Sequence, residues 1–204
     1  MMYLSGKYVP NPAIGSLFTY NGFLRKQLDD VWAADNGCFC QADKYSNEGY
    51  LAWLSKLDPT DCLFAVAPDV VGDSEATKER AYPMIPKIQE LGYRAAFVLQ
   101  DGETVDGIDW DLIDAVFVGG STEWKLSQHA AEIVRHAKSL GKWAHMGRVN
   151  SYKRMRLAAA IGCDSVDGTF LVFGPDVNEK RLIDWLTRMR QEPLLDFLPS
   201  EADK

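Results

Sequence analysis

The sequence predicts an α/β protein of the (β/α)8 TIM-like barrel class, and three observations lead to this prediction. Short apolar segments, rich in β-branched and aromatic residues, alternate with segments of helical periodicity. The apolar segments are continuous, which is typical of parallel strands that are covered on both faces. Polar residues follow one apolar segment after another, as expected where the carboxyl ends of barrel strands meet.

Six segments are predicted as strands, and a further strand is expected near Tyr3. The six are residues 31–35, 62–69, 95–100, 115–119, 143–147 and 165–169. Helices are predicted at residues 47–57, 73–81, 127–141, 151–162 and 177–190. Asp73 or Ser74 can cap one helix start, Gly141 and Gly162 end two others, and Pro83 and Pro86 break a longer helical pattern into pieces.

The sequence lacks the motifs of the dinucleotide-binding and P-loop α/β folds. No G-x-G-x-x-G opens the first helix, and no G-x-x-x-x-G-K-[ST] is found. A length of 204 residues favours a single domain over residues 1–204, with an acidic tail from about 192 to 204. This length is short for a barrel, which leaves open whether one or two βα units are abbreviated or missing.

Composition narrows the class of protein. The chain is 47% hydrophobic and 25% charged, as in ordinary globular proteins, and its formal net charge of −7 excludes a broadly basic nucleic-acid coat but not a local basic patch. We expect no membrane association and a cytoplasmic location, because there is no apolar run of about 18 residues and no signal-peptide core. The four cysteines and three histidines lack zinc-like spacing, so no metal site is predicted.

The residues at the predicted strand ends suggest glycosyl-transfer chemistry. In chain order they are Asp35, Asp69, Gln100, Gly119 with Gly120, Arg148 with Asn150, and Asp167. Two carboxylates facing one glycosidic bond can divide the work, one attacking the anomeric carbon and the other moving a proton. Asp35 and Asp167 are the candidates for this pair. The alternative is that each carboxylate only caps the helix or turn that follows it.

Several of these segments carry a resemblance to a known family. ADNGCFCQ (residues 34–41) is similar to the D-S-G-G-[FY]-Q segment of the tRNA-guanine transglycosylases, the queuine tRNA-ribosyltransferase family. FVLQDG (97–102) and VFVGG (116–120) are similar to the family's I-V-Q-G and G-G-L strand ends. HMGRVNS (145–151), followed by GCDSVDGT (162–169), resembles its M-G-V-G and G-x-D-x-F-D-C-V pair. The segments occur in the family's order.

The resemblance implies a role for each matching residue. Asp167 would be the nucleophile, and Asp35 would be the general acid/base that handles the proton of the leaving or incoming base. Asp69 and Gln100 would hydrogen-bond the purine edge, with backbone groups at Gly119 and Gly120. Phe39 would stack on the base. The implied reaction replaces guanine by a 7-deazaguanine through a covalent aspartyl-glycosyl intermediate, without a cofactor.

The sequence also departs from the family. Its C-terminal C-x-C-x-x-C…H zinc site is absent, since no cysteine follows Cys163 and no histidine follows His145. A barrel without this tRNA-docking part resembles the short phage and bacterial enzymes that place 7-deazaguanines, such as 7-cyano-7-deazaguanine, in DNA. We therefore expect DNA and a free deazaguanine base as partners, in the host cytoplasm if the protein is phage-encoded. Whether a helper protein opens the duplex is left open.

A set of basic residues could contact a nucleic-acid backbone. Arg148, Lys153, Arg154 and Arg156 lie just after a predicted strand end, where they could bind phosphates, or they could simply form the solvated first turn of a helix. Three other functions remain open at this point: exchange on tRNA, hydrolysis of a nucleoside or base N-glycoside on the same barrel, and a non-catalytic barrel that binds nucleobases. An unrelated barrel enzyme acting on a phosphorylated sugar has less support, because no glycine-rich phosphate cradle follows the late strands.

Overall fold

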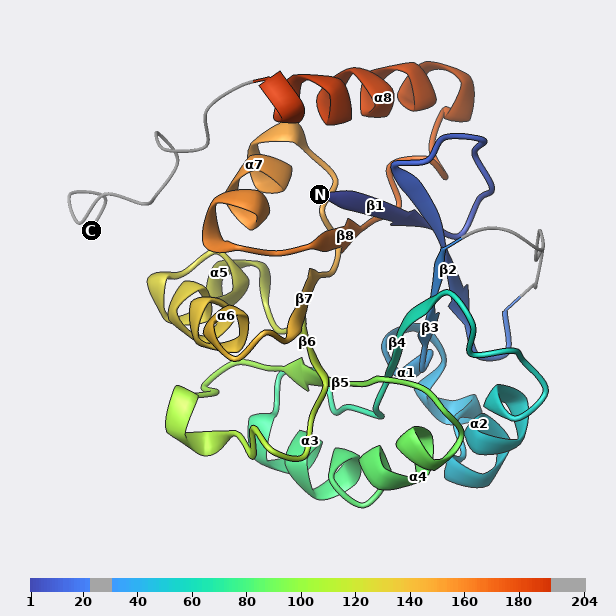
Figure 1. Ribbon diagram of the computed structural model, residues 1–204, viewed down its shortest axis with the longest axis vertical. Coiled ribbons are helices and arrows are strands. Elements are labelled where there is room, and N and C mark those ends of the chain that lie inside the picture. The colour runs from blue at the N-terminus through green and yellow to red at the C-terminus, as the bar shows by residue number, and fades with distance from the viewer. Residues whose placement is uncertain (23–30, 192–204) are drawn as a thin grey trace.

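The computed structural model describes residues 1–22 and 31–191 and contains a closed barrel of eight parallel strands (Figure 1). The strands are β1 (Met2–Ser5), β2 (Ile14–Thr19), β3 (Trp32–Asp35), β4 (Cys62–Val66), β5 (Ala95–Leu99), β6 (Ala115–Val118), β7 (Trp143–Met146) and β8 (Ser165–Asp167). Each strand pairs with the next in chain order, and β8 closes the ring against β1, with Leu4 opposite Asp167. The fold predicted from the sequence is therefore confirmed.

Helices surround the barrel on its outside, as Figure 1 shows. They are α1 (Cys38–Gln41), α2 (Asn47–Leu54), α3 (Ser74–Ala81), α4 (Ile85–Glu90), α5 (Thr122–Lys125), α6 (Gln128–Ser139), α7 (Tyr152–Ile161) and α8 (Pro175–Gln191), with short 3-10 turns η1 (Ala42–Lys44) and η2 (Val105–Gly107). No described helix is long and apolar enough to cross a membrane.

The predicted helix boundaries have local causes in the structure. Asp73 caps α3 by accepting from the N–H of Ala76, and Ser127 caps α6 through the N–H of Ala130. Gly162 ends α7 in the left-handed conformation, which costs glycine little. Pro86 lies in the first turn of α4, where its missing N–H is tolerated, so the proline-containing segment forms two helices.

Residues alternate between two hydrophobic cores along each strand. One set, which includes Leu4, Ala33, Phe64, Val98 and Ala115, fills the inside of the barrel. Their sequence neighbours, such as Tyr3, Ala65 and Val116, pack outward against the helices. Burial on both faces explains why strands such as β5 and β6 are continuously apolar, as the pattern indicated. Polar side chains are confined mainly to the strand ends, and that is where the site forms.

The beginning of the barrel differs most from expectation. β2 was not predicted, because IGSLFT contains a glycine, a serine and a threonine that weaken the strand pattern. All eight strands are present, but the connection from β1 to β2 spans only residues 6–13 and contains no helix. Among the described residues, this first βα unit is therefore abbreviated, and the connection from β5 to β6 likewise contains only the short 3-10 turn η2. The predicted tail, residues 192–204, lies outside the described residues.

Candidate active site at the carboxyl ends of the strands

A cavity of about 390 Å³ opens at the carboxyl ends of the strands. Every strand supplies to its lining the residue at its end or one just beyond: Gly6, Thr19, Asp35, Val66, Gln100, Gly119, Gly147 and Asp167. The floor is apolar, with side chains such as Leu17, Val98 and Phe117. A pocket of this kind at this end of a barrel is where catalytic residues of such folds collect.

The structure brings most of the sequence-predicted residues together. The lining includes Asp35, Phe39, Asp69, Gln100, Gly119, Gly120, Arg148 and Asp167. Lys153, Arg154 and Arg156, on α7, do not line the cavity. Lys153 is exposed, Arg154 is partly buried, and the guanidinium of Arg156 lies 5.9 Å from the ring centroid of Tyr152. Of the four basic residues proposed to bind a backbone, only Arg148 belongs to the pocket itself.

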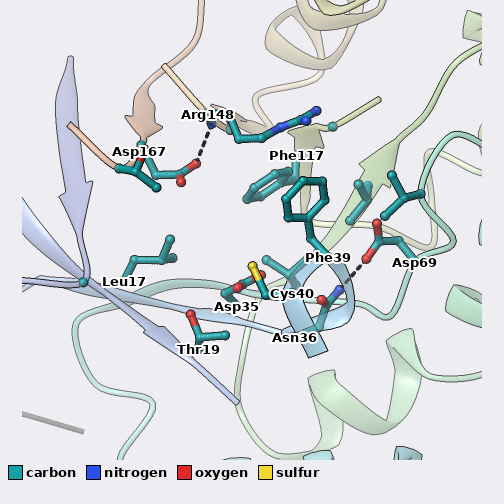
Figure 2. Close-up of a pocket in the computed structure, with 18 of the residues that line it drawn as sticks. Leu17, Thr19, Asp35, Asn36, Phe39, Cys40, Asp69, Phe117, Arg148 and Asp167 are labelled. Carbon is teal, nitrogen blue, oxygen red and sulfur yellow. Dashed lines mark hydrogen bonds between the residues drawn. The ribbon is translucent and has the colours of Figure 1, made fainter. Parts of the chain in front are cut away.

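Asp167 ends β8 with its carboxylate directed into the cavity (Figure 2). Its Oδ1 lies 3.1 Å from Nε2 of His145 and 3.3 Å from the backbone N of Arg148. Its Oδ2 accepts no hydrogen bond from residues 1–22 or 31–191. One oxygen is thus held by the barrel wall, while the other is available to a ligand.

His145 connects Asp167 to a chain of buried polar groups. It lies on β7 and is fully buried, with its ring 4.6 Å from that of Phe117 and 5.2 Å from that of Phe64, centroid to centroid. Its Nδ1 lies 2.8 Å from Oγ of Ser165, which in turn accepts a hydrogen bond from the indole nitrogen of Trp143 at 2.9 Å. The nucleophile candidate is therefore supported from inside the barrel.

Asp35 ends β3 and faces the same cavity. The pKa of its carboxyl is raised from 3.8 to about 7, mainly by burial and also by the negative charges of Asp167 and Asp69, while hydrogen bonds from the Thr19 hydroxyl and the Gly37 backbone act in the opposite direction. A carboxyl group with a pKa near 7 can give or take a proton at neutral pH, as general acid/base catalysis requires. Asp35 and Asp167 thus differ in environment, which separates their possible roles.

Asp69, Gln100 and Asn36 form a buried hydrogen-bond network beside Asp35. Asp69 accepts from Nδ2 of Asn36 at 2.9 Å and from Nε2 of Gln100 at 2.8 Å. Oε1 of Gln100 accepts from the backbone N–H groups of Gly72 and Gly120, at 2.9 and 3.0 Å. Burial raises the pKa of Asp69, although these donors and Arg80 oppose the rise. The network joins the segments that follow β3, β4, β5 and β6.

The mouth of the cavity is formed by Arg148 and Phe39. The Arg148 guanidinium lies 4.8 Å from the centroid of the Phe39 ring and donates to the carbonyl of Gly120. Phe39 is 58% exposed, and Val71 and Val172 add further exposed apolar surface to the rim. Figure 2 shows the Phe39 ring and the Arg148 side chain over the cavity. A planar ligand entering here would meet an aromatic face and a cation.

Lys125 supports the loop between β7 and α7 from behind. Only 2% of this residue is exposed, and its Nζ donates to the carbonyl of Gly147 at 2.8 Å. The pKa of its ammonium is lowered from 10.5 to about 8, mainly by burial and also by the nearby positive charge of Arg148, while Asp167 acts in the opposite direction. The lysine therefore places a buried positive charge close to the nucleophile candidate.

Four residues that form or support this site were not predicted from the sequence. His145, Asn36, Lys125 and Thr19 were assigned no role. His145 could have been found, because it lies two residues before Gly147 on β7 and so points to the same side of the strand. Thr19 was missed because β2 was missed, whereas nothing in the sequence indicates that Lys125 is buried.

Comparison with known proteins supports the fold alone. No family model matches the sequence, and no curated protein matches it. Among solved structures, a native KDPGal structure aligns with a TM-score of 0.54 over 87% of this chain and 83% of that chain, at 10% identity. Barrel architecture is therefore shared at a level of identity that says nothing about substrate.

Two structures of tryptophan synthase from M. tuberculosis are also similar. The open form with BRD0059 bound and the aminoacrylate- and BRD0059-bound form align at 19% and 18% identity, each with a TM-score of 0.45 over 79% of this chain. The chain spans 57% of the length of those two chains.

Proposed function

We propose that this protein is a nucleic-acid guanine transglycosylase that exchanges guanine for a 7-deazaguanine in DNA. The observation that carries the proposal is the pair of carboxylates in one cavity: Asp167, which the described residues contact through Oδ1 and not through Oδ2, and Asp35, whose pKa lies near 7. Glycosyl exchange with retention needs one carboxylate that attacks and one that moves a proton. The resemblance of five sequence segments to the transglycosylases indicates guanine as the base that is exchanged.

In the first half-reaction, Oδ2 of Asp167 attacks C1′ of the sugar. The C1′–N9 bond breaks, its electron pair leaves with guanine, and protonated Asp35 supplies the proton that makes the departing base neutral. Near pH 7 a substantial fraction of Asp35 is protonated, which suits it to this task. The product is a covalent glycosyl ester on Asp167.

In the second half-reaction, the incoming base takes guanine's place. The ionised Asp35 removes the proton from N9 of the 7-deazaguanine, N9 attacks C1′, and the bond between C1′ and Asp167 breaks, which restores the free carboxylate. Two inversions give net retention, and the energy of the glycosidic bond is conserved in the ester. No redox step is involved.

The wall between Asp35 and Arg148 would recognise the base. The carboxylate of Asp69 and the backbone groups of Gly119 and Gly120 line the cavity, and Phe39 and Arg148 offer stacking surfaces at its mouth. Gln100 is only 1% exposed, and its oxygen is already used by two backbone N–H groups, which favours a role in fixing Asp69 and Gly120. A base inside a duplex would have to be flipped out to reach this wall.

The test of this proposal is base exchange followed by nucleoside mass spectrometry. Purified protein is incubated with guanine-labelled DNA or, separately, with tRNA, in the presence of 7-cyano-7-deazaguanine. We expect deazaguanine to appear in DNA and labelled guanine to be released. Incorporation into tRNA alone would correct the polymer, and an abasic sugar without incorporation would indicate an N-glycoside hydrolase instead.

Two substitutions test the assigned roles. Asp167→Ala should abolish covalent trapping on the nucleic acid, because the attacking oxygen is gone. Asp35→Asn should retain binding and lose turnover, because the proton donor is gone. Asp114→Asn is a suitable control, since that carboxylate bonds to Gln89 and to the backbone of Ala95 and does not line the cavity. Full exchange activity in Asp167→Ala would contradict the mechanism.

A further inference from the structure

We infer that His145, in its neutral Nε2–H tautomer, is a positioning residue that fixes Oδ1 of Asp167 and so aims Oδ2 at the sugar carbon. The inference deepens the proposed function and rests on it for the identity of the attacking atom. It starts from three consecutive contacts inside the barrel, which run from Trp143 through Ser165 and His145 to Asp167.

The direction of these hydrogen bonds follows from the need to pair the hydroxyl hydrogen of Ser165, which is fully buried. The indole N–H of Trp143 can only donate, so Oγ of Ser165 is an acceptor in that contact. The Ser165 hydroxyl hydrogen is then available for Nδ1 of His145, 2.8 Å away. A ring nitrogen that accepts carries no proton, so the proton of the neutral imidazole is on Nε2. Nε2 can therefore donate to Oδ1 of Asp167. In this arrangement the indole nitrogen, the serine hydroxyl and both imidazole nitrogens each have a hydrogen-bond partner.

The surroundings of His145 limit its alternatives. The residue is fully buried between Phe64 and Phe117, so it cannot turn toward water without breaking the inner core. Among the described residues, its ring nitrogens contact only Ser165 and Asp167. Ser165 itself is fully buried, which makes an unpaired hydroxyl costly there.

Two donors on one oxygen define the orientation of the carboxylate. The Nε2–H of His145 approaches Oδ1 from the inside of the barrel, and the N–H of Arg148 approaches the same oxygen from the loop after β7. A carboxylate bound at one oxygen by two donors cannot exchange its oxygens by rotation without losing both. Loss of the histidine donor should therefore slow attack without weakening the binding of substrate, because His145 does not line the cavity.

The first experiment needs no activity. In protein labelled with ¹⁵N-histidine, two-bond ¹H–¹⁵N correlation spectra distinguish the Nε2–H from the Nδ1–H tautomer, and only His129, His136 and His145 contribute. Loss of one signal set in His145→Gln assigns it. We expect His145 to show the Nε2–H pattern at neutral pH. An Nδ1–H pattern, or a ring that exchanges between tautomers, would overturn the inference even if the exchange reaction is confirmed.

The second experiment separates positioning from folding. The amide nitrogen of His145→Gln can occupy the position of Nε2 and donate to Asp167, whereas the shorter side chain of His145→Asn cannot reach it. In single-turnover trapping on DNA we expect His145→Asn to form the ester about 10- to 100-fold more slowly with KM unchanged, and His145→Gln to recover much of that loss. Equal rates for the two variants, when both keep wild-type melting temperatures, would exclude the role. His129→Gln, on the exposed face of α6, is the control.

The two experiments fail in distinguishable ways. If the wild-type protein exchanges no base in either polymer, the proposed function is wrong and the tautomer measurement still decides the state of His145. If exchange occurs but Ser165→Ala leaves the Nε2–H pattern and the trapping rate unchanged, the hydrogen-bond chain does not set the tautomer and the inference is wrong.

Discussion

The backbone N–H of Arg148 points at Oδ1 of Asp167 from a left-handed conformation, with φ of 60° at Arg148. A non-glycine residue in this region stores roughly 1 kcal/mol or more of strain, which the surrounding contacts must offset. Here the guanidinium binds the Gly120 carbonyl and stacks on Phe39, and Lys125 holds the carbonyl of the preceding residue, Gly147. The backbone of this strained turn thus contacts Asp167, while its side chain forms part of the mouth of the pocket.

Arg148→Gly separates these two functions. Glycine keeps the N–H and tolerates the left-handed conformation, so the protein should remain folded and still form the ester on Asp167. Loss of the guanidinium should weaken DNA binding and reduce the slope of log K against log salt by about 1, if the side chain contacts one phosphate. Fluorescence anisotropy across a salt series measures this slope. An unchanged slope would mean that Arg148 serves the pocket mouth alone.

Asp35 should make stability depend on pH in a defined direction. Its pKa is about 7 in the folded protein and near 4 in the unfolded chain, so between these values the folded state binds more protons. The contribution of Asp35 to the free energy of unfolding is therefore fully present below about pH 4 and is lost as pH rises through about 7. Urea titrations give the free energy of unfolding at each pH. The value for Asp35→Asn minus that for wild type should increase by about 2 to 4 kcal/mol from pH 4 to pH 8. A pH-independent difference would show that Asp35 titrates normally.

Lys125 should make stability increase with pH, in a range above that of Asp35. Its pKa is lowered from 10.5 to about 8 in the folded protein, so between pH 8 and 10 the unfolded chain binds more protons and this residue's contribution to stability rises with pH. Lys125→Met removes that rise and leaves the Gly147 carbonyl without its donor. The free energy of unfolding of wild type minus that of Lys125→Met should increase by about 1 to 3 kcal/mol from pH 8 to 10. A constant difference would contradict the assignment.

Gln100→Leu tests the buried network. Leucine fills a similar volume but leaves the N–H groups of Gly72 and Gly120 without their acceptor, and Asp69 loses one donor. We expect a destabilisation of about 2 to 4 kcal/mol in chemical denaturation, together with weaker selection of the base. Gln89→Leu, which breaks a network outside the pocket at Asp114, is the matched control for base selection. Loss of selectivity in the control as well would indicate a general effect of stability.

Gly147 and Gly6 form a matched pair at the pocket wall. A Cβ on Gly147 would lie 2.8 Å from the Phe117 ring and 3.3 Å from Oδ1 of Asp167, whereas a Cβ on Gly6 would meet nothing within 4 Å. Gly147→Ala should therefore lower the melting temperature by several degrees, corresponding to about 1 to 3 kcal/mol, and slow ester formation. Gly6→Ala should change neither. Equal behaviour of the two variants would mean that the Phe117 ring yields freely.

The sequence predicted the barrel and the positions of its polar residues, for a physical reason that the structure makes visible. Strands buried on both faces are mainly apolar, so Asp35 and Asp167 stand out at the ends of β3 and β8, and Asp69 stands out three residues beyond the end of β4. The sequence did not show that Asp69 and Gln100 bond to each other, since side-chain pairing depends on the distance between strand ends. The position of His145 on its strand could have been read from the sequence, but its contacts with Ser165 and Asp167 could not, because they depend on the neighbouring strand.

The two carboxylates and the rim of the cavity lie on different kinds of backbone. Asp35 and Asp167 end strands of a closed ring, whereas the exposed Phe39, Val71 and Val172 lie in the segments that follow strands. Substitutions at Val71 and Val172 would therefore leave the backbone that carries the two carboxylates in place, whereas Phe39 also contacts Arg148 beside Asp167. If the proposed exchange reaction is confirmed, a laboratory selection for altered targets would best begin by randomising these rim positions.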